Sequence, residues 1–184
     1  KPIYLDYNAT TPHDPEVVDA MRPYLEEEFG NPSSLHWYGI RPKKAVMDAR
    51  RRVASLLDCE AKEIIFTSGG TESDNASIKG VALNRGSGHI ITTRIEHPAV
   101  LKVVGWLEKQ GFQATYLPVG PDGIVDPEEF RKAIRDETIM ASIMHANNEV
   151  GTIQPIAELC AVTGKYGIAF HTDAAQSLGK IDVR

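Results

Sequence analysis

Short apolar runs rich in β-branched residues recur along the chain at intervals of about 25 residues, and stretches with helical spacing separate them. The runs lie at residues 64–66, 89–93, 115–119, 139–144 and 168–170, and the helical stretches lie at residues 71–84, 98–110, 127–135 and 155–166. A strand, a helix and a second strand at this spacing form a right-handed crossover, so that the strands are parallel. The pattern predicts an α/β fold with three α/β/α layers around a mostly parallel sheet.

Two further helices are expected before these units. Asp14 offers an N-cap and Pro15 occupies the first helical position, a pairing typical of a helix start. A later stretch, residues 45–57, has apolar residues on one face and basic residues on the other, which is typical of a helix with a solvated face. Residues 3–5 resemble a strand, and the polar residues 6–12 after them are interpreted as a loop at a site.

No internal repeat, low-complexity tract or linker rich in Pro, Gly or Ser divides the chain. With 184 residues, 42% of them apolar, the chain can bury a core and has the size of one domain. We therefore expect a single domain over residues 1–184. Because the chain stops just past a strand and leaves a sheet edge uncovered, we also expect it to be the amino-terminal part of a larger protein.

The net charge of −5 is spread along the chain without long runs of one sign, which gives no indication of a nucleic-acid or membrane partner. The two cysteines, Cys59 and Cys160, are far apart and lack the spacing of a disulfide framework or a zinc ribbon. No apolar run reaches the length of a membrane span, and no signal-like segment opens the chain. A cytoplasmic protein is predicted, unless a targeting segment has been removed before residue 1.

The segment TSGGTES, residues 67–73, follows a predicted strand and opens a predicted helix. Backbone N–H groups and the positive end of the helix would converge there, and Gly70 would let an anion approach the backbone. Thr71 and the neighbouring serines can add hydroxyl donors. The segment is neither a dinucleotide fingerprint nor a P-loop, so we expect a phosphate cradle of another kind. The alternative is a capped turn that binds nothing.

Polar residues also follow three later strands of the pattern. His97 can stack on a flat ring or move protons, Asn147 and Asn148 offer amides, and Asp173 and Gln176 can meet a ring nitrogen and a ring oxygen. Each has a plainer interpretation, since His97 and Asp173 are also good helix caps and tandem asparagines are typical of turns. Because open α/β sheets place their chemistry at the carboxyl ends of strands, the coincidence of four such ends favours one shared site.

Two other kinds of site were considered. Three histidines and two acids, namely His97, His145, His171, Glu149 and Asp173, could supply metal ligands, but no helical ligand pair fixes a third ligand. We therefore expect no metal. A serine or cysteine hydrolase is disfavoured because the chain has no G-x-S-x-G and no cysteine beside a histidine that follows a strand.

Six motifs together resemble the cysteine desulfurases of the NifS and IscS type, and they cover nearly the whole chain in order. The motifs are YLDYNATTP at residues 4–12, GNPSS at 30–34, FTSGGTES at 66–73, EH at 96–97, ANNEVG at 146–151 and HTDAAQS at 171–177. The resemblance implies the fold type I of enzymes that use pyridoxal 5'-phosphate, within the class V aminotransferase group, and an incomplete large domain of that fold. It implies the conversion of L-cysteine to L-alanine, with the sulfur passed to an enzyme cysteine as a persulfide for iron–sulfur cluster or thio-cofactor assembly.

The resemblance also implies roles for individual residues. Asp173 would pair with the pyridinium nitrogen, Gln176 with the phenolic oxygen of the ring, and Asn148 with that oxygen or the substrate carboxylate. His97 would stack on the ring and transfer protons as the catalytic residue, Gly70 and Thr71 would hold the phosphate, and Asn8 would lie near the substrate entrance. A homodimer and a partner that accepts sulfur or acts as a scaffold are implied for the full-length protein.

The chain departs from the family in what it lacks. The family's Schiff-base lysine, its persulfide-forming cysteine, the arginine for the substrate carboxylate and the small carboxy-terminal domain have no counterpart in this sequence, and Lys180 matches a non-catalytic position. We therefore expect this chain alone to be inactive and to hold the cofactor weakly. Selenocysteine lyase, another class V enzyme, or a scaffold with this fold remain the alternatives.

Overall fold

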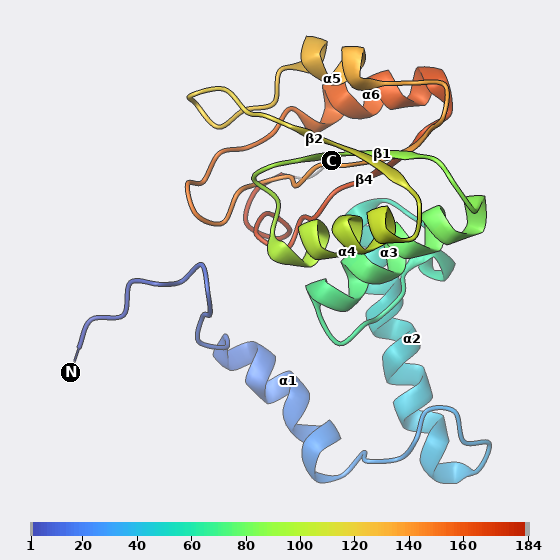
Figure 1. Ribbon diagram of the computed structural model, residues 1–184. Helices are drawn as coiled ribbons and strands as arrows, with labels where there is room; N and C mark the ends of the chain where they lie inside the picture. Colours follow the sequence, from blue (N-terminus) through green and yellow to red (C-terminus); the bar gives the residue numbers. More distant parts are fainter. Residues whose placement is uncertain (1, 183–184) are drawn as a thin grey trace. The chain divides into compact units, whose positions relative to one another are not determined.

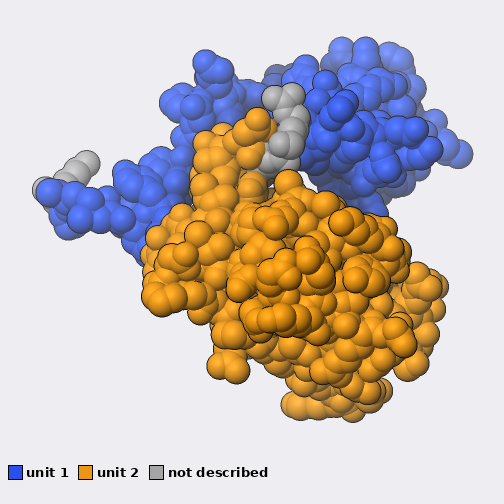
Figure 2. Space-filling model, turned by 90° about the horizontal axis from the view of Figure 1, so that it is seen from above, with its two compact units in different colours: residues 1–66, 184 blue, residues 67–183 orange. Residues whose placement is uncertain are grey.

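The computed structural model describes residues 2–182, and their contacts divide them into two compact units (Figure 2). Unit 1 comprises residues 2–66, and unit 2 comprises residues 67–182 of the described chain. The single domain expected over residues 1–184 stays a prediction.

Unit 1 consists of two α-helices and a short 3-10 turn. Helix α1 spans Pro15–Glu26, and the side chain of Asp14 caps it by accepting the Glu16 N–H at 2.8 Å, as the sequence predicts. Helix α2 spans Trp37–Leu57 and ends where Asp58 adopts a left-handed conformation. The 3-10 turn η1 spans Ala61–Glu63. No residue of α1 is buried, so this helix contributes little to a core within the described chain.

Two strands expected in unit 1 are absent, and both predictions were wrong. Residues 3–5 and 64–66 are extended but belong to no strand. The side chain of Ile65 is 79% exposed. An apolar tripeptide becomes a strand only when a neighbouring strand pairs with its backbone groups, and the described part of the chain pairs no strand with these residues. The segment 67–73 therefore opens a helix without following a strand.

Unit 2 contains a four-stranded parallel sheet in the order β2-β1-β3-β4. The strands are β1 (His89–Thr93), β2 (Gln113–Leu117), β3 (Thr138–Ser142) and β4 (Ala169–His171). The helices are α3 (Gly70–Arg85), α4 (Pro98–Lys109), α5 (Pro127–Ala133) and α6 (Ile156–Tyr166). Helices α3 and α4 cover one face of the sheet, and α5 and α6 cover the other (Figure 1). This arrangement confirms the predicted three-layer α/β/α fold.

The register of the sheet explains the two hydrophobic cores. Ile90 of β1 lies beside Met140 of β3, and both belong to the core with α3 and α4. The next pair, Ile91 and Ala141, points the opposite way and belongs to the core with α5 and α6. Because successive side chains of a strand alternate between faces, a run that is apolar throughout can feed two cores. All five residues of β1, a histidine, two isoleucines and two threonines, are buried, so both faces of this strand are covered.

None of the helices in the described part is long and apolar enough to cross a membrane.

Candidate functional site

The candidate site lies in unit 2, where the carboxyl ends of parallel strands share one edge of the sheet. Helix α3 runs antiparallel to β1, which follows it, so its amino end lies at this edge as well. Charged groups on different elements interact there. Asp74 of α3 is coupled electrostatically to Asp173, which follows β4, and to His97, which follows β1. The structure therefore brings three of the predicted segments together.

The amino end of α3 is open. Gly69 is the N-cap and no side chain caps the helix. A Cβ added at Gly69 or Gly70 would meet no heavy atom within 4 Å, so the backbone at this turn is accessible. Backbone N–H groups at the start of a helix bind anions well. Gly70 and Thr71 thus have the geometry of a phosphate cradle, and both residues are exposed.

The hydroxyl groups near this turn already have protein partners. Ser68 donates its backbone N–H and its hydroxyl to Glu72 Oε2, at 2.7 and 2.6 Å, and the Ser73 hydroxyl lies 2.7 Å from that of Thr67. The hydroxyl and backbone of Ser68 lower the pKa of the Glu72 carboxyl. An incoming phosphate would compete with the Glu72 carboxylate for the Ser68 donors.

His97 is exposed and is the N-cap of α4, where its Nδ1 accepts the Ala99 N–H at 3.1 Å. The plainer interpretation of this residue as a cap is therefore correct. Because Nδ1 accepts a hydrogen bond, the proton of the neutral ring is on Nε2. The cap fixes the orientation of the ring, which lies near Asp74.

The tandem asparagines after β3 have different surroundings. Asn147 is buried, donates from Nδ2 to the Ile95 carbonyl at 3.0 Å, and accepts the Glu149 and Val150 N–H groups at Oδ1. Asn148 is partly exposed and donates to Glu149 Oε1. Asn147 therefore holds the loop, and Asn148 is the one whose amide can reach a ligand.

This difference predicts that two alanine substitutions affect stability to different extents. Asn147→Ala should lower the free energy of unfolding by about 1–3 kcal/mol, because it leaves buried polar groups without partners. Asn148→Ala should change it by no more than about 0.5 kcal/mol. Urea unfolding of the two variants, followed by circular dichroism, measures both. Equal destabilisation would contradict the division of roles.

Asp173 and Gln176 lie in a series of turns after β4, where the structure has no helix. Asp173 Oδ1 accepts the Ala175 N–H at 2.9 Å, and its carbonyl accepts the His145 N–H. The residue therefore forms an Asx turn and is not the cap of a helix. Gln176 Oε1 accepts from Lys180 Nζ at 2.9 Å. Both side chains are half-buried.

Burial changes the charge of the groups around Asp173. Burial, followed by the negative charge of Asp173, raises the pKa of Asp74 from 3.8 to about 6, against an opposing effect of His97. Burial also lowers the pKa of His171, so this imidazole is uncharged at neutral pH. The His171 Nε2 atom lies 3.6 Å from Asp74 Oδ1, and this is a polar contact rather than an ion pair because the imidazole is uncharged. The His171 Nδ1 atom is hydrogen-bonded to the Ser142 hydroxyl.

Sequence reasoning did not single out Asp74, although a signal was present. Asp74, Ile78 and Ala82 recur every four residues along α3, and all three are buried. An acid in line with an apolar stripe is expected to face a polar group inside the fold.

Two further candidates are Asn8, expected near the substrate entrance, and His145, considered as a metal ligand. Asn8 lies in unit 1, in a polar turn after residue 6. His145 Nδ1 lies 3.0 Å from the Ser177 hydroxyl. Among residues 2–182, no three His, Cys, Asp or Glu side chains are arranged to hold a metal ion.

Comparison with known proteins gives consistent similarities. The sequence profile of the family described as "Aminotransferase class-V" matches residues 3–184. Cysteine desulfurase IscS of Dictyoglomus turgidum is 54% identical over 183 residues, which are 98% of this chain and 46% of that protein. Cysteine desulfurase IscS of Methanosarcina thermophila is 55% identical over 185 residues, or 100% of this chain and 46% of that protein. The chain thus spans about half the length of the curated relatives it matches.

Solved structures agree with this similarity. A structure described as "SspA in complex with cysteine" has a TM-score of 0.94 and 42% identity, and the match covers 98% of this chain and 53% of that one. An apo cysteine desulfurase from Thermococcus onnurineus has a TM-score of 0.90 and 28% identity, with 98% of this chain and 46% of that one covered.

Proposed function

Because the chain belongs to the class V aminotransferase family, we propose that it is the cofactor-binding part of a cysteine desulfurase. The full-length protein, meaning this chain with the portion that its relatives have in addition, would convert L-cysteine to L-alanine and transfer the sulfur. The observation that carries the proposal is the convergence of Asp173, His97 and the amino end of α3 on one edge of the sheet. The relatives named cysteine desulfurase support it.

Membership of this family implies pyridoxal phosphate as the cofactor of the full-length protein. The residues present fit that group. The open turn at Gly70 suits a phosphate, and the half-buried carboxylate of Asp173 suits a ring nitrogen. When bound, the cofactor supplies an electron sink for a carbanion at the substrate.

The chain's own residues would then bind, orient and move protons. Gly70 and Thr71 would donate backbone N–H groups to the phosphate. Asp173 would keep the ring nitrogen protonated through its negative charge. His97, oriented by its cap at Ala99, would present Nε2 for proton transfer and stack on the ring.

Other residues would complete the site. Gln176 would donate to the phenolic oxygen of the ring, and Asn148 would donate to that oxygen or to the substrate carboxylate. Asn8 would contribute near the substrate entrance. The Schiff-base lysine, the persulfide-forming cysteine, the carboxylate-binding arginine, a second copy of the chain and a sulfur acceptor belong to the full-length protein in this proposal. A cytoplasmic location is part of the same proposal.

The proposal is tested by the products formed from L-cysteine. We expect the full-length protein with pyridoxal phosphate to release sulfide and alanine, and the 184-residue chain to produce neither above the rate of the free cofactor, because none of its lysines stands in the family's lysine motif. Parallel assays with selenocysteine and other amino acids separate the sibling activities. A full-length protein that forms no product from any of them would contradict the proposal and favour a scaffold.

A further inference from the structure

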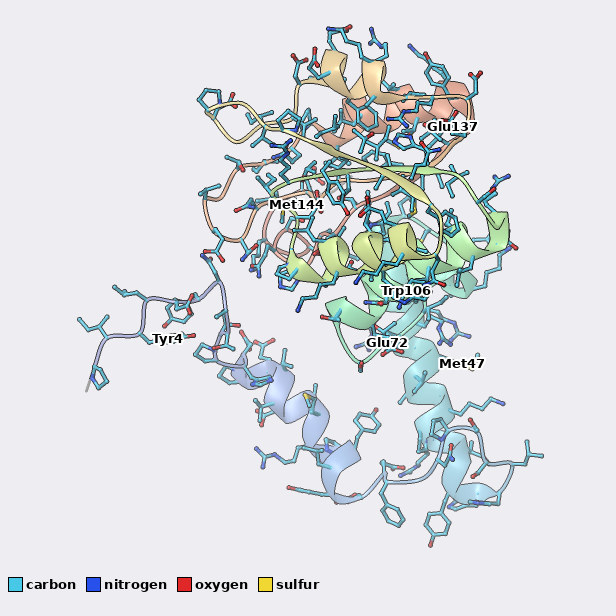
Figure 3. The ribbon with its side chains drawn as sticks, in the orientation of Figure 1. Tyr4, Met47, Glu72, Trp106, Glu137 and Met144 are labelled. Carbon is cyan, nitrogen blue, oxygen red and sulfur yellow. The ribbon has the colours of Figure 1, made fainter. Side chains whose placement is uncertain are left out.

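Glu96 carries a buried carboxyl group between two loops of the candidate site. Its side chain is 4% exposed. Oε1 accepts the Thr93 hydroxyl at 2.6 Å and the Met144 N–H at 3.0 Å. Thr93 ends β1, and Met144 lies just beyond β3, at the edge where the site residues gather (Figure 3). The carboxyl group thus bridges the ends of two neighbouring strands.

The bridge connects the segments that carry two predicted site residues. His97 follows Glu96 directly, and Asn148 follows Met144 by four residues. A second bond, from Asn147 Nδ2 to the Ile95 carbonyl, joins the same two segments. Glu96 and Asn147 therefore hold the loop after β1 against the loop after β3.

The other oxygen of Glu96 has an unusual environment. Oε2 is buried and has no hydrogen-bond partner. The charged groups that act on the carboxyl are Asp173, which follows β4, and Asp74 on α3, and both are acids. None of the ion pairs described within residues 2–182 involves Glu96. A buried carboxylate beside two acids, with one oxygen unsolvated, is costly, and adding a proton removes that cost.

These contacts have a measurable consequence for protonation. Burial raises the pKa of Glu96 from 4.5 to about 7, and Asp173 and Asp74 add to the rise, while the bonds from Thr93 and Met144 oppose it. The carboxyl therefore gains or loses its proton near neutral pH. When it ionises, repulsion by two acids and the lack of water favour opening of the loops.

We propose that Glu96 is a positioning residue of this site, which ties the segment that carries His97 to the segment that carries Asn148. The inference rests on the proposed function, because the site that it orders is the proposed cofactor site. Glu96 acts through the two loops and does not touch the ligand.

Three variants separate the effect of the hydrogen bonds that Glu96 accepts from the effect of its negative charge. Glu96→Gln keeps the accepting oxygen and cannot ionise, whereas Glu96→Ala removes the bridge. Glu137→Gln removes an exposed acid just before β3, at the opposite end of the sheet from Met144 (Figure 3), and is the matched control.

The first measurement is made on the 184-residue chain. Carbon-13 NMR of labelled glutamate side chains should show one carboxyl with a midpoint near 7 that is missing from Glu96→Gln and present in Glu137→Gln. Because the folded-state pKa lies above the ordinary 4.5, the contribution of this carboxyl to stability is greatest at low pH and is lost as pH rises through 7. The stability of Glu96→Gln relative to the wild type should therefore rise over this interval. A midpoint near 4.5 would overturn the inference.

The second measurement is the affinity of the full-length protein for pyridoxal phosphate between about pH 6 and pH 8, roughly one unit on either side of the midpoint. We expect Glu96→Ala to bind about tenfold more weakly than Glu96→Gln throughout this interval. The affinity of the wild type and of Glu137→Gln should fall relative to Glu96→Gln as pH rises. If Glu96→Gln follows the wild type, or if Glu96→Ala binds normally, the inference is wrong while the proposed function stands. If no variant binds the cofactor, the proposed function fails and the role of Glu96 toward it fails as well.

Discussion

Replacing Asp173 by alanine in the full-length protein is expected to lower kcat by about a hundredfold or more, comparable to the loss of one preorganised electrostatic contact. The affinity for pyridoxal phosphate should fall far less, because the phosphate at Gly70 and the ring stacked on His97 would remain bound. The reason is that the carboxylate acts on charge that develops during the reaction, whereas most of the binding comes from other groups. Steady-state kinetics with L-cysteine and a fluorescence titration with the cofactor measure the two quantities.

Two further variants make this result specific. Asp173→Asn keeps an oxygen that can accept the Ala175 N–H, so it removes the charge and preserves the Asx turn. It should lose turnover nearly as fully as the alanine variant. Asp136→Ala, which removes an exposed acid just before β3, should leave both quantities unchanged. Equal losses of turnover and affinity at Asp173 would contradict the role assigned to its charge.

The sheet of unit 2 could be predicted from the sequence because its central strands, β1 and β3, are largely buried on both faces. The strand expected at residues 89–93 is β1 residue for residue, and the other three differ from β2, β3 and β4 by one or two residues at their ends. An unbroken β-branched run bounded by polar turns has few other interpretations when helices with proline at their first position follow it. Pro98 and Pro127 mark the starts of α4 and α5 in this way.

Unit 1 shows why short apolar segments are ambiguous. Residues 64–66 have the composition of a strand, but Arg50 lies over the Phe66 ring and its Nε donates to the Ile64 carbonyl. A side chain thus takes the place of a neighbouring strand at one backbone group. Local composition cannot indicate which partner the backbone will find, because that partner comes from a distant part of the chain.

The sequence predicted those site residues whose position depends on the order of the strands. It missed those whose role depends on how side chains pack. His97, Asn148 and Asp173 follow strands, so the parallel order of the sheet is enough to gather their segments at one edge. The position of Asp74 depends on which face of α3 is buried. The bridging contacts of Glu96 depend on the rotamer of its side chain. A pattern of spacing shows that a residue is buried, but it does not identify the atom that the residue meets.

Leu107→Ala should lower the free energy of unfolding of the 184-residue chain by about 2.5–5 kcal/mol. Leu107 lies in α4 with none of its side chain exposed, and it belongs to the core formed with Ile90, Phe112 and Met140. Truncation leaves a cavity where strands β1 and β3 meet the helix layer. Because a domain of this size is stabilised by roughly 5–15 kcal/mol, the transition should move to much lower urea concentration.

The matched control is Leu83→Ala in α3, the same chemical change at a side chain that is 53% exposed. Leucine and alanine both favour helices, so this variant should change the free energy of unfolding by about 0.5 kcal/mol or less. The two variants then differ only in the packing of the deleted atoms. If both variants lost the same stability, α4 would not be packed on the sheet through Leu107.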